Sequence, residues 1–152
     1  MSIPGPVFAW GSVSEDIALF KALDSEQRSK TFDAMVRQDL VRGEVLVAQG
    51  DPSDSLYVVL HGALAVRRTG ESLPIAELRA GELVGEIGFF ANLPRTANVI
   101  AIRDTSVLAL TRAAYQTLAE ATPAITESLL GALALRFAKR TERIPTIRTS
   151  PM

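Results

Sequence analysis

The most informative stretch of this sequence lies at residues 81–99, where the chain reads GELVGEIGFFANLPRTANV. A predicted strand ends at Val84, and Gly85 and Gly88 then allow the backbone to approach another group closely. Residues 87–91 tolerate a single helical turn, and amide hydrogens exposed at the start of such a turn can bind an anion. The stretch therefore predicts a strand, a tight turn and an anion site in close succession.

Two charged side chains indicate what the anion is. Arg95 follows the helical turn, and its planar guanidinium matches two phosphate oxygens, each charge-assisted contact contributing about 1.5–3 kcal/mol. Glu86 lies close to the anion site, where a carboxylate suits sugar hydroxyls rather than phosphate. Taken singly, Arg95 reads as a surface cation after Pro94 and Glu86 as a solvated turn residue. Together, a phosphate and a ribose hydroxyl recognised on one loop describe a nucleotide.

Around this stretch, residues 40–112 alternate short apolar runs with turn residues at intervals of about ten, a pattern typical of an all-β sandwich or barrel. The predicted strands are Glu44–Gln49, Ser55–Leu60, Ala63–Arg68, Pro74–Leu78, Glu82–Val84, Ala97–Ile102 and Ser106–Thr111.

Helices are predicted on both sides of the β segment. Residues 14–36 read as a short helix, a break, and a second helix that begins after the N-cap Asp24 and ends near Arg37. Another short helix is predicted at Ala113–Ala119. After Thr122 and Pro123 comes a longer helix, able to fold back as a lid. Its apolar stripe consists of Ile125, Leu129, Leu133 and Phe137, more typical of core contacts than of ligand contacts.

Composition limits the chemistry. The 152 residues include 16 Lys and Arg, 17 Asp and Glu, one histidine and no cysteine, which excludes thiolate and multi-histidine metal sites. The net charge of -1 argues against a protein that coats nucleic acid or anionic membranes. The single histidine, His61, is expected to be exposed and idle in a hairpin turn. No nucleophile elbow or phosphate-hydrolysing loop is present, so we expect binding without catalysis, and no cofactor or metal.

The ends of the chain read as tails, residues 1–13 and 141–152, the second as a tail or a truncated linker. The start lacks the basic region and apolar core of a signal peptide, and no run approaches the roughly 18 apolar residues of a membrane span. These features favour a cytoplasmic protein that does not insert into membranes.

The 81–99 stretch resembles the phosphate-binding cassette of cyclic nucleotide-binding domains, the family shared by protein kinase A regulatory subunits, catabolite activator protein and cyclic-nucleotide-gated channels. Gly85, Glu86, Gly88, Arg95 and Ala97 match the family pattern in order and spacing. The similarity extends over most of the chain, and the resemblance implies one such domain at residues 14–140. The implied fold class is mainly β with flanking helices (α+β): an eight-stranded β-roll or jelly-roll barrel with N-terminal helices and a C-terminal lid helix.

Carried onto this sequence, the resemblance implies that Glu86 accepts the ribose 2′-hydroxyl and that Arg95 pairs with the cyclic phosphate. Backbone amides around Gly85, Ile87 and Ala97 would complete the cradle. Thr96 follows the arginine, where a hydroxyl can reach the purine or the phosphate, and it leaves cAMP and cGMP both open. Weaker candidates for covering the base, all on the lid helix, are Leu130, Leu133 and Arg136.

Three residues depart from the family pattern. Val84 replaces an aromatic residue, Phe89 replaces a leucine, and Asn98 replaces a hydroxyl-bearing residue near the phosphate. The first two changes are expected to alter packing only, and the third to have a modest effect on affinity.

The favoured function is therefore a regulatory sensor that binds cAMP or cGMP reversibly and passes a movement of the lid helix to an effector domain or a partner protein. The alternative, suggested by Val84 and Asn98, is an interaction or dimerisation domain with an empty site or a cyclic dinucleotide ligand. A transcription factor would need a helix-turn-helix after the lid, and the residues that follow Phe137 are too few, so direct nucleic-acid binding by this chain is not expected.

Overall fold

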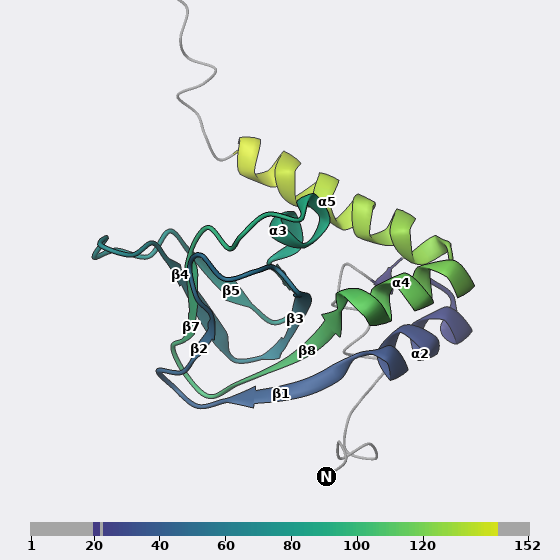
Figure 1. Cartoon of the computed structure of the whole chain (residues 1–152), viewed down its shortest axis with the longest axis horizontal. Helices are drawn as coiled ribbons and strands as arrows, with labels where there is room; N and C mark the ends of the chain where they lie inside the picture. The colour runs from purple at the N-terminus through teal and green to yellow at the C-terminus, as the bar shows by residue number, and fades with distance from the viewer. Residues whose placement is uncertain (1–19, 22, 143–152) are drawn as a thin grey trace, which may run out of the picture.

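The computed structural model describes residues 20, 21 and 23–142. Over these residues the chain forms eight strands and four α-helices, shown in Figure 1. The helices are α2 (Ser25–Ala34), α3 (Glu86–Ala91), α4 (Arg112–Ala121) and α5 (Ala124–Glu142). The strands are β1 (Val36–Leu40), β2 (Val45–Val47), β3 (Ser55–His61), β4 (Ala63–Arg67), β5 (Ala76–Arg79), β6 (Leu83–Val84), β7 (Asn98–Ala101) and β8 (Thr105–Thr111).

The strands pair as two four-stranded antiparallel sheets, in the orders β1-β8-β3-β6 and β2-β7-β4-β5. Neighbours such as β3 and β8 are far apart in sequence, as in a jelly roll rather than a simple meander. The predicted fold class, mainly β with flanking helices, is therefore confirmed. Figure 1 shows the helices gathered on one side of the sheets, with α2 beside α4 and α5 continuing from α4.

Strands β3 and β8, the two central strands of the first sheet, are buried on both faces. Val58 and Leu108 pack toward the helices, while their neighbours Val59 and Val107 pack toward the second sheet. Side chains of successive strand residues point to opposite faces, so two buried faces require the unbroken apolar runs seen in both strands. The largest side chains buried on the helix side are Phe20, Phe89, Leu56, Leu108, Leu110, Ile125 and Leu129.

Helix capping agrees with the sequence. Asp24 caps α2, accepting from the Gln27 amide at 2.8 Å while the Gln27 side chain accepts from the Asp24 amide at 3.0 Å. Thr111 caps α4 by accepting from the amide of Ala114. The helix start predicted after Asp24 is therefore confirmed, and the partly buried Phe32 and Ala34 of α2 pack against the core on the helix side of the sheets.

One predicted element is wrong. The helix expected to end near Arg37 stops at Ala34, and Met35 is already extended. Residues Val36–Leu40 instead form β1, which pairs with β8 over its whole length. The apolar residues at positions 32, 35 and 36 fit a helical period, but hydrogen bonds to a strand 70 residues away decide the conformation.

Other predictions differ only in extent or lie outside the description. The helix predicted at Ala113–Ala119 begins one residue earlier and ends two later. The first predicted helix, within residues 14–23, and the tails at 1–13 and 141–152 fall almost entirely outside the described residues. Among the helices described here, none is long and apolar enough to cross a membrane.

Candidate anion site at the start of helix α3

A left-handed turn sets the start of α3. Gly85 lies between β6 and α3 with φ of 79°, a conformation that L-residues rarely adopt. A Cβ atom at this position would overlap the Nη1 atom of Arg95. The helix ends at Asn92, also left-handed, whose amide donates to the carbonyl of Gly88. The close approach predicted for Gly85 is therefore real, and its partner is the arginine of the same stretch.

Arg95 is buried and held by main-chain oxygens. Its side chain donates to the Ser55 carbonyl at 2.6 Å and the Gly85 carbonyl at 3.3 Å, and the residue is only 7% exposed. The guanidinium carbon lies 5.9 Å from the centroid of the Tyr57 ring. The Nε atom is buried and has no hydrogen-bond partner among the described residues. A buried donor without a partner is costly, and an anion bound beside it would satisfy it.

The electrostatic balance around Arg95 is unusual. Burial lowers the pKa of Arg95, and the nearby Arg112 acts in the same direction. Tyr57, Asp54 and Asp51 partly offset this by raising it. Within the described part of the chain, Arg95 makes no ion pair with a carboxylate. The cation is thus desolvated but not neutralised, which is favourable for binding an external anion.

The other predicted site residues lie around this arginine. Glu86, the first residue of α3, is 4% exposed, so it is not a solvated turn residue. Ala97 is 8% exposed, whereas Ile87 and Thr96 are exposed. Gly85 joins the two halves of the site, which are the start of α3 and the Arg95 side chain. Its carbonyl accepts from Arg95, and Gly85 directly precedes Glu86 in the chain. The structure therefore brings together the start of α3 and the arginine after its end.

Gly88 approaches a residue that sequence reasoning missed. A Cβ atom on Gly88 would overlap the Ser53 hydroxyl, which itself donates to the Leu93 carbonyl at 2.5 Å. Arg112 donates to the carbonyls of Ser53 and Phe89, both at 2.8 Å, and lies 4.6 Å from the Phe89 ring centroid. One signal was available: Arg112 is the first residue of α4, where the helix dipole disfavours a cation.

The lid candidates are only partly described. Leu130 is 56% exposed and Leu133 is half-buried, while the side chain of Arg136 lies outside the described ones. The apolar stripe starts as predicted, with Ile125 and Leu129 fully buried. Phe137, the last member of the stripe, also has an undescribed side chain.

An aromatic cluster connects α3 with α4 and α5. The rings of Phe89, Phe90 and Tyr115 meet edge to face, with centroids 5.2–5.6 Å apart. The Tyr115 hydroxyl lies 3.0 Å from the hydroxyl of Thr126 in α5. Phe89, which was expected to alter packing only, is thus central to this contact.

Asn98 is engaged away from Arg95. Its side-chain oxygen accepts from the Gln49 amide at 2.8 Å, and its nitrogen donates to the Thr69 hydroxyl at 3.2 Å. These contacts join the start of β7 to the loops after β2 and β4, and the expected modest effect of Asn98 on affinity stays a prediction. Val84, the other departure noted above, is buried in the core between the sheets.

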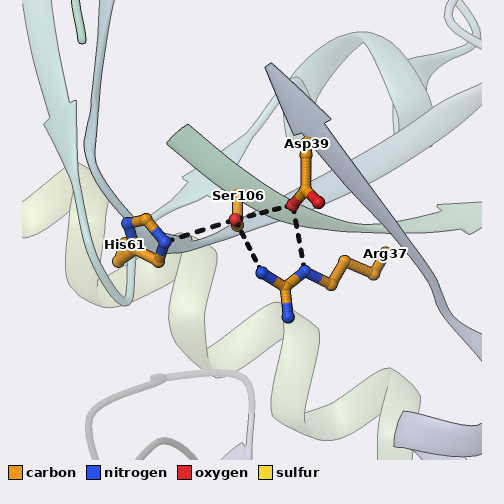
Figure 2. A network of polar contacts seen from close by, with 4 residues as sticks. All are labelled: Arg37, Asp39, His61 and Ser106. Atoms are coloured by element: carbon orange, nitrogen blue, oxygen red, sulfur yellow. Dashed lines mark hydrogen bonds and ion pairs between the residues drawn. The ribbon is translucent and has the colours of Figure 1, made fainter. Parts of the chain in front are cut away.

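His61 is exposed but not idle, contrary to the sequence prediction. Its Nε2 atom lies 3.3 Å from the hydroxyl of Ser106, which donates to Asp39 at 2.7 Å and accepts from Arg37 at 3.1 Å. Figure 2 shows these four side chains converging from β1, β3 and β8. Ser106 lies between the acid and the imidazole, so the order differs from that of a catalytic triad. In the described residues, no group of three potential ligands could hold a metal ion.

Comparison with known proteins gives consistent results. A family model described as cyclic nucleotide-binding domain matches residues 37–122. The cAMP-dependent protein kinase regulatory subunit of Neurospora crassa is 30% identical over 107 residues, covering 70% of this chain and 28% of that protein. A cGMP-dependent protein kinase of Caenorhabditis briggsae is 34% identical over 96 residues, covering 63% of this chain and 13% of the kinase.

One solved structure extends the comparison to the fold. The crystal structure of a cyclic nucleotide-binding domain from Methylobacillus flagellatus KT matches with a TM-score of 0.76 at 26% identity, covering 93% of this chain and 83% of that one. The chain therefore spans most of this solved domain but only a minor part of the two curated relatives.

Proposed function

The chain belongs to the cyclic nucleotide-binding domain family, and from this premise we propose that it is a sensor that binds cAMP or cGMP reversibly and passes a movement of α5 to an effector. The observation that carries this proposal is Arg95, a buried cation held by carbonyl groups with one donor unpartnered. A cyclic phosphate diester bears a single negative charge and two free oxygens, which suits one guanidinium.

The chemistry of binding divides between the two ends of α3. Arg95, held by its carbonyl contacts, would donate from its unpartnered Nε to a phosphate oxygen and form a charge-assisted pair. The first amides of α3, at Ile87 and Gly88, have no acceptor within the helix and add a positive end. Glu86 would accept the ribose hydroxyl. Together with the Gly85 and Ala97 amides, these groups recognise phosphate and sugar without regard to the base.

Discrimination between cAMP and cGMP would rest on Thr96. Its side chain is exposed next to Arg95, so its hydroxyl is free to reach a purine from the phosphate side. Of the relatives named above, one is the regulatory subunit of a cAMP-dependent protein kinase and the other is a cGMP-dependent protein kinase. We expect Thr96→Ala to change the ratio of the two affinities more than it changes the affinity for cAMP itself.

Signal transmission would use the aromatic cluster. A shift of α3 on ligand binding moves Phe89 and Phe90, which contact Tyr115 and, through its hydroxyl, Thr126 of α5. The ligand shifts this equilibrium only by its differential affinity for the two positions of α5. Hydrogen exchange of the α5 amides with and without cAMP tests this step. Exchange rates in α5 that ignore saturating ligand would contradict it.

The binding proposal is tested by calorimetric titration of the wild-type chain with cAMP and cGMP, using linear 5′-AMP as the control. We expect heat and saturation for at least one cyclic nucleotide and much weaker binding of the linear one. The linear phosphate carries a second negative charge, and a single guanidinium would leave that charge unpaired in a buried site. No binding of either cyclic nucleotide at high micromolar concentration would overturn the proposal.

The alternative of an interaction domain with an empty site gains nothing from the residues that suggested it. Val84 is buried in the core, and Asn98 bonds to Gln49 and Thr69. Mass spectrometry of the ligand retained through gentle purification separates a cyclic mononucleotide from a cyclic dinucleotide.

A further inference from the structure

The loop between β2 and β3 contacts both halves of the candidate anion site, α3 and Arg95. The carbonyl of Asp51 accepts from the Arg95 amide at 2.8 Å, and the amide of Gly50 donates to the Arg95 carbonyl at 2.9 Å. At the end of the loop, the Ser55 carbonyl accepts from the Arg95 side chain at 2.6 Å. The loop therefore fixes the backbone and the guanidinium of Arg95 at once.

Ser53, in the middle of this loop, fixes the other half. Its hydroxyl donates to the Leu93 carbonyl at 2.5 Å, just after the C-terminal end of α3. The same hydroxyl fills the space beside Gly88 so closely that a Cβ atom there would overlap it. Ser53 is 4% exposed, so its hydroxyl meets α3 rather than solvent.

The main chain of Ser53 adds a second tie to the same helix. Its carbonyl accepts from Arg112 at 2.8 Å, and the same guanidinium nitrogen donates to the Phe89 carbonyl at 2.8 Å. Arg112 therefore bridges the loop and the C-terminal half of α3, and its guanidinium lies over the Phe89 ring. Ser53 holds α3 through its hydroxyl on one side and through this bridge on the other.

We infer that Ser53 is a positioning residue for the cyclic phosphate: it sets the place of α3 relative to Arg95, so that the helix amides and the guanidinium reach the same anion. The inference rests on the proposed function and adds to it a residue outside the 81–99 stretch. Ser53 does not itself touch the ligand, because its hydroxyl is buried and already donates to Leu93. Small misplacements of a binding group cost affinity without unfolding the protein.

The test is the affinity of Ser53→Ala for cAMP and cGMP, measured by calorimetry beside its thermal stability. The matched control is Ser106→Ala, which removes another buried serine hydroxyl, one that donates to Asp39 at 2.7 Å at the far end of β3. We expect both variants to lose a similar, small amount of stability. Only Ser53→Ala should weaken binding, by about tenfold.

A double-mutant cycle separates positioning from general loosening. Gly88→Ala places a methyl group against the Ser53 hydroxyl and should weaken binding in the wild-type background. Its effect should be smaller in Ser53→Ala, because the nearest atom that the new methyl meets, the hydroxyl oxygen, is gone. Independent effects of the two substitutions on affinity would contradict a direct contact.

The outcomes distinguish this inference from the proposed function. If the wild-type chain binds a cyclic nucleotide and Ser53→Ala binds it within twofold of the wild-type affinity, the inference is wrong and the function stands. If the wild-type chain does not bind, the proposed function is wrong, and amide exchange in residues 86–91 then tests whether the Ser53 hydroxyl positions α3. Faster exchange in Ser53→Ala than in Ser106→Ala supports the positioning role of the hydroxyl, and equal exchange overturns it.

Discussion

The side-chain contacts of Arg95 and of the Arg37 network reach opposite ends of strand β3, and the two arginines differ in their electrostatic surroundings. Arg95 contacts Ser55 at the start of β3, and the Arg37 network reaches His61 at its end, about 20 Å away for a seven-residue strand. Arg37 donates to the Asp39 carboxylate at 3.0 Å, whereas Arg95 donates to two carbonyl groups.

The difference favours Arg95 as the arginine that would bind a ligand. The charge of Arg37 is paired with the Asp39 carboxylate, so this ion pair stabilises the local structure of β1 and β8. The charge of Arg95 is buried without such a match, and a bound anion would offset the cost of the desolvation that lowers the pKa of Arg95. The sequence motif singles out Arg95, and the partners of the two arginines add the physical difference between them.

The largest expected effect comes from exchanging the two arginines in turn for glutamine. Arg95→Gln should weaken cyclic nucleotide binding by 100-fold or more, because about two charge-assisted bonds of 1.5–3 kcal/mol each are lost. Arg37→Gln should leave the affinity within about twofold and lower only the melting temperature. Calorimetry and thermal unfolding measure both quantities on the same samples. Equal losses of affinity in the two variants would remove the distinction drawn here.

A second, smaller effect concerns the turn that brings Arg95 to α3. Gly85→Ala introduces a methyl group that overlaps Arg95 Nη1, in a left-handed conformation that by itself costs about 1–2 kcal/mol. Gly70→Ala is the matched control, since Gly70 also has positive φ but open space around it. We expect both variants to lose stability and only Gly85→Ala to lose affinity, by about tenfold. Equal affinities would mean that the guanidinium position does not limit binding.

The same contrast explains what could be predicted from the sequence. The turn at Gly85, the helix after it and the return through Arg95 were predictable, because local residue types within 19 positions determine them. β1 was not, because its conformation depends on pairing with β8, and its own apolar spacing fits a helix equally well.

Side-chain partners were the least predictable part of both regions. Ser106 meets Asp39 across 67 residues, so His61 could not be seen to belong to a network. Ser53 and Arg112 act through main-chain carbonyls, which carry no sequence signature. For such contacts the sequence offers one clue, a cation at the first position of a helix, as at Arg112.

The smallest expected effect is the pH dependence of the Arg37 network. Hydrogen bonds from Ser106 and then Arg37 hold the pKa of Asp39 below its usual range. Because the folded-state pKa is the lower one, this stabilisation is present above the ordinary aspartate pKa of about 3.9 and is lost as the pH falls through the folded value. The Asp39 side chain is 68% exposed, so solvent screening keeps the contribution below about 1 kcal/mol.

Thermal unfolding of the wild-type chain and Asp39→Asn between pH 3 and pH 7 measures this contribution. The wild-type chain should be slightly more stable than the variant near neutral pH, and the gap should close below about pH 4 as the carboxylate takes up a proton. Cyclic nucleotide affinity at pH 7 should be equal in the two chains, because Asp39 lies at the end of β3 away from Arg95. A loss of affinity in Asp39→Asn would show that the Arg37 network affects binding at the other end of β3. The distinction between a structural Arg37 and a binding Arg95 would then be wrong.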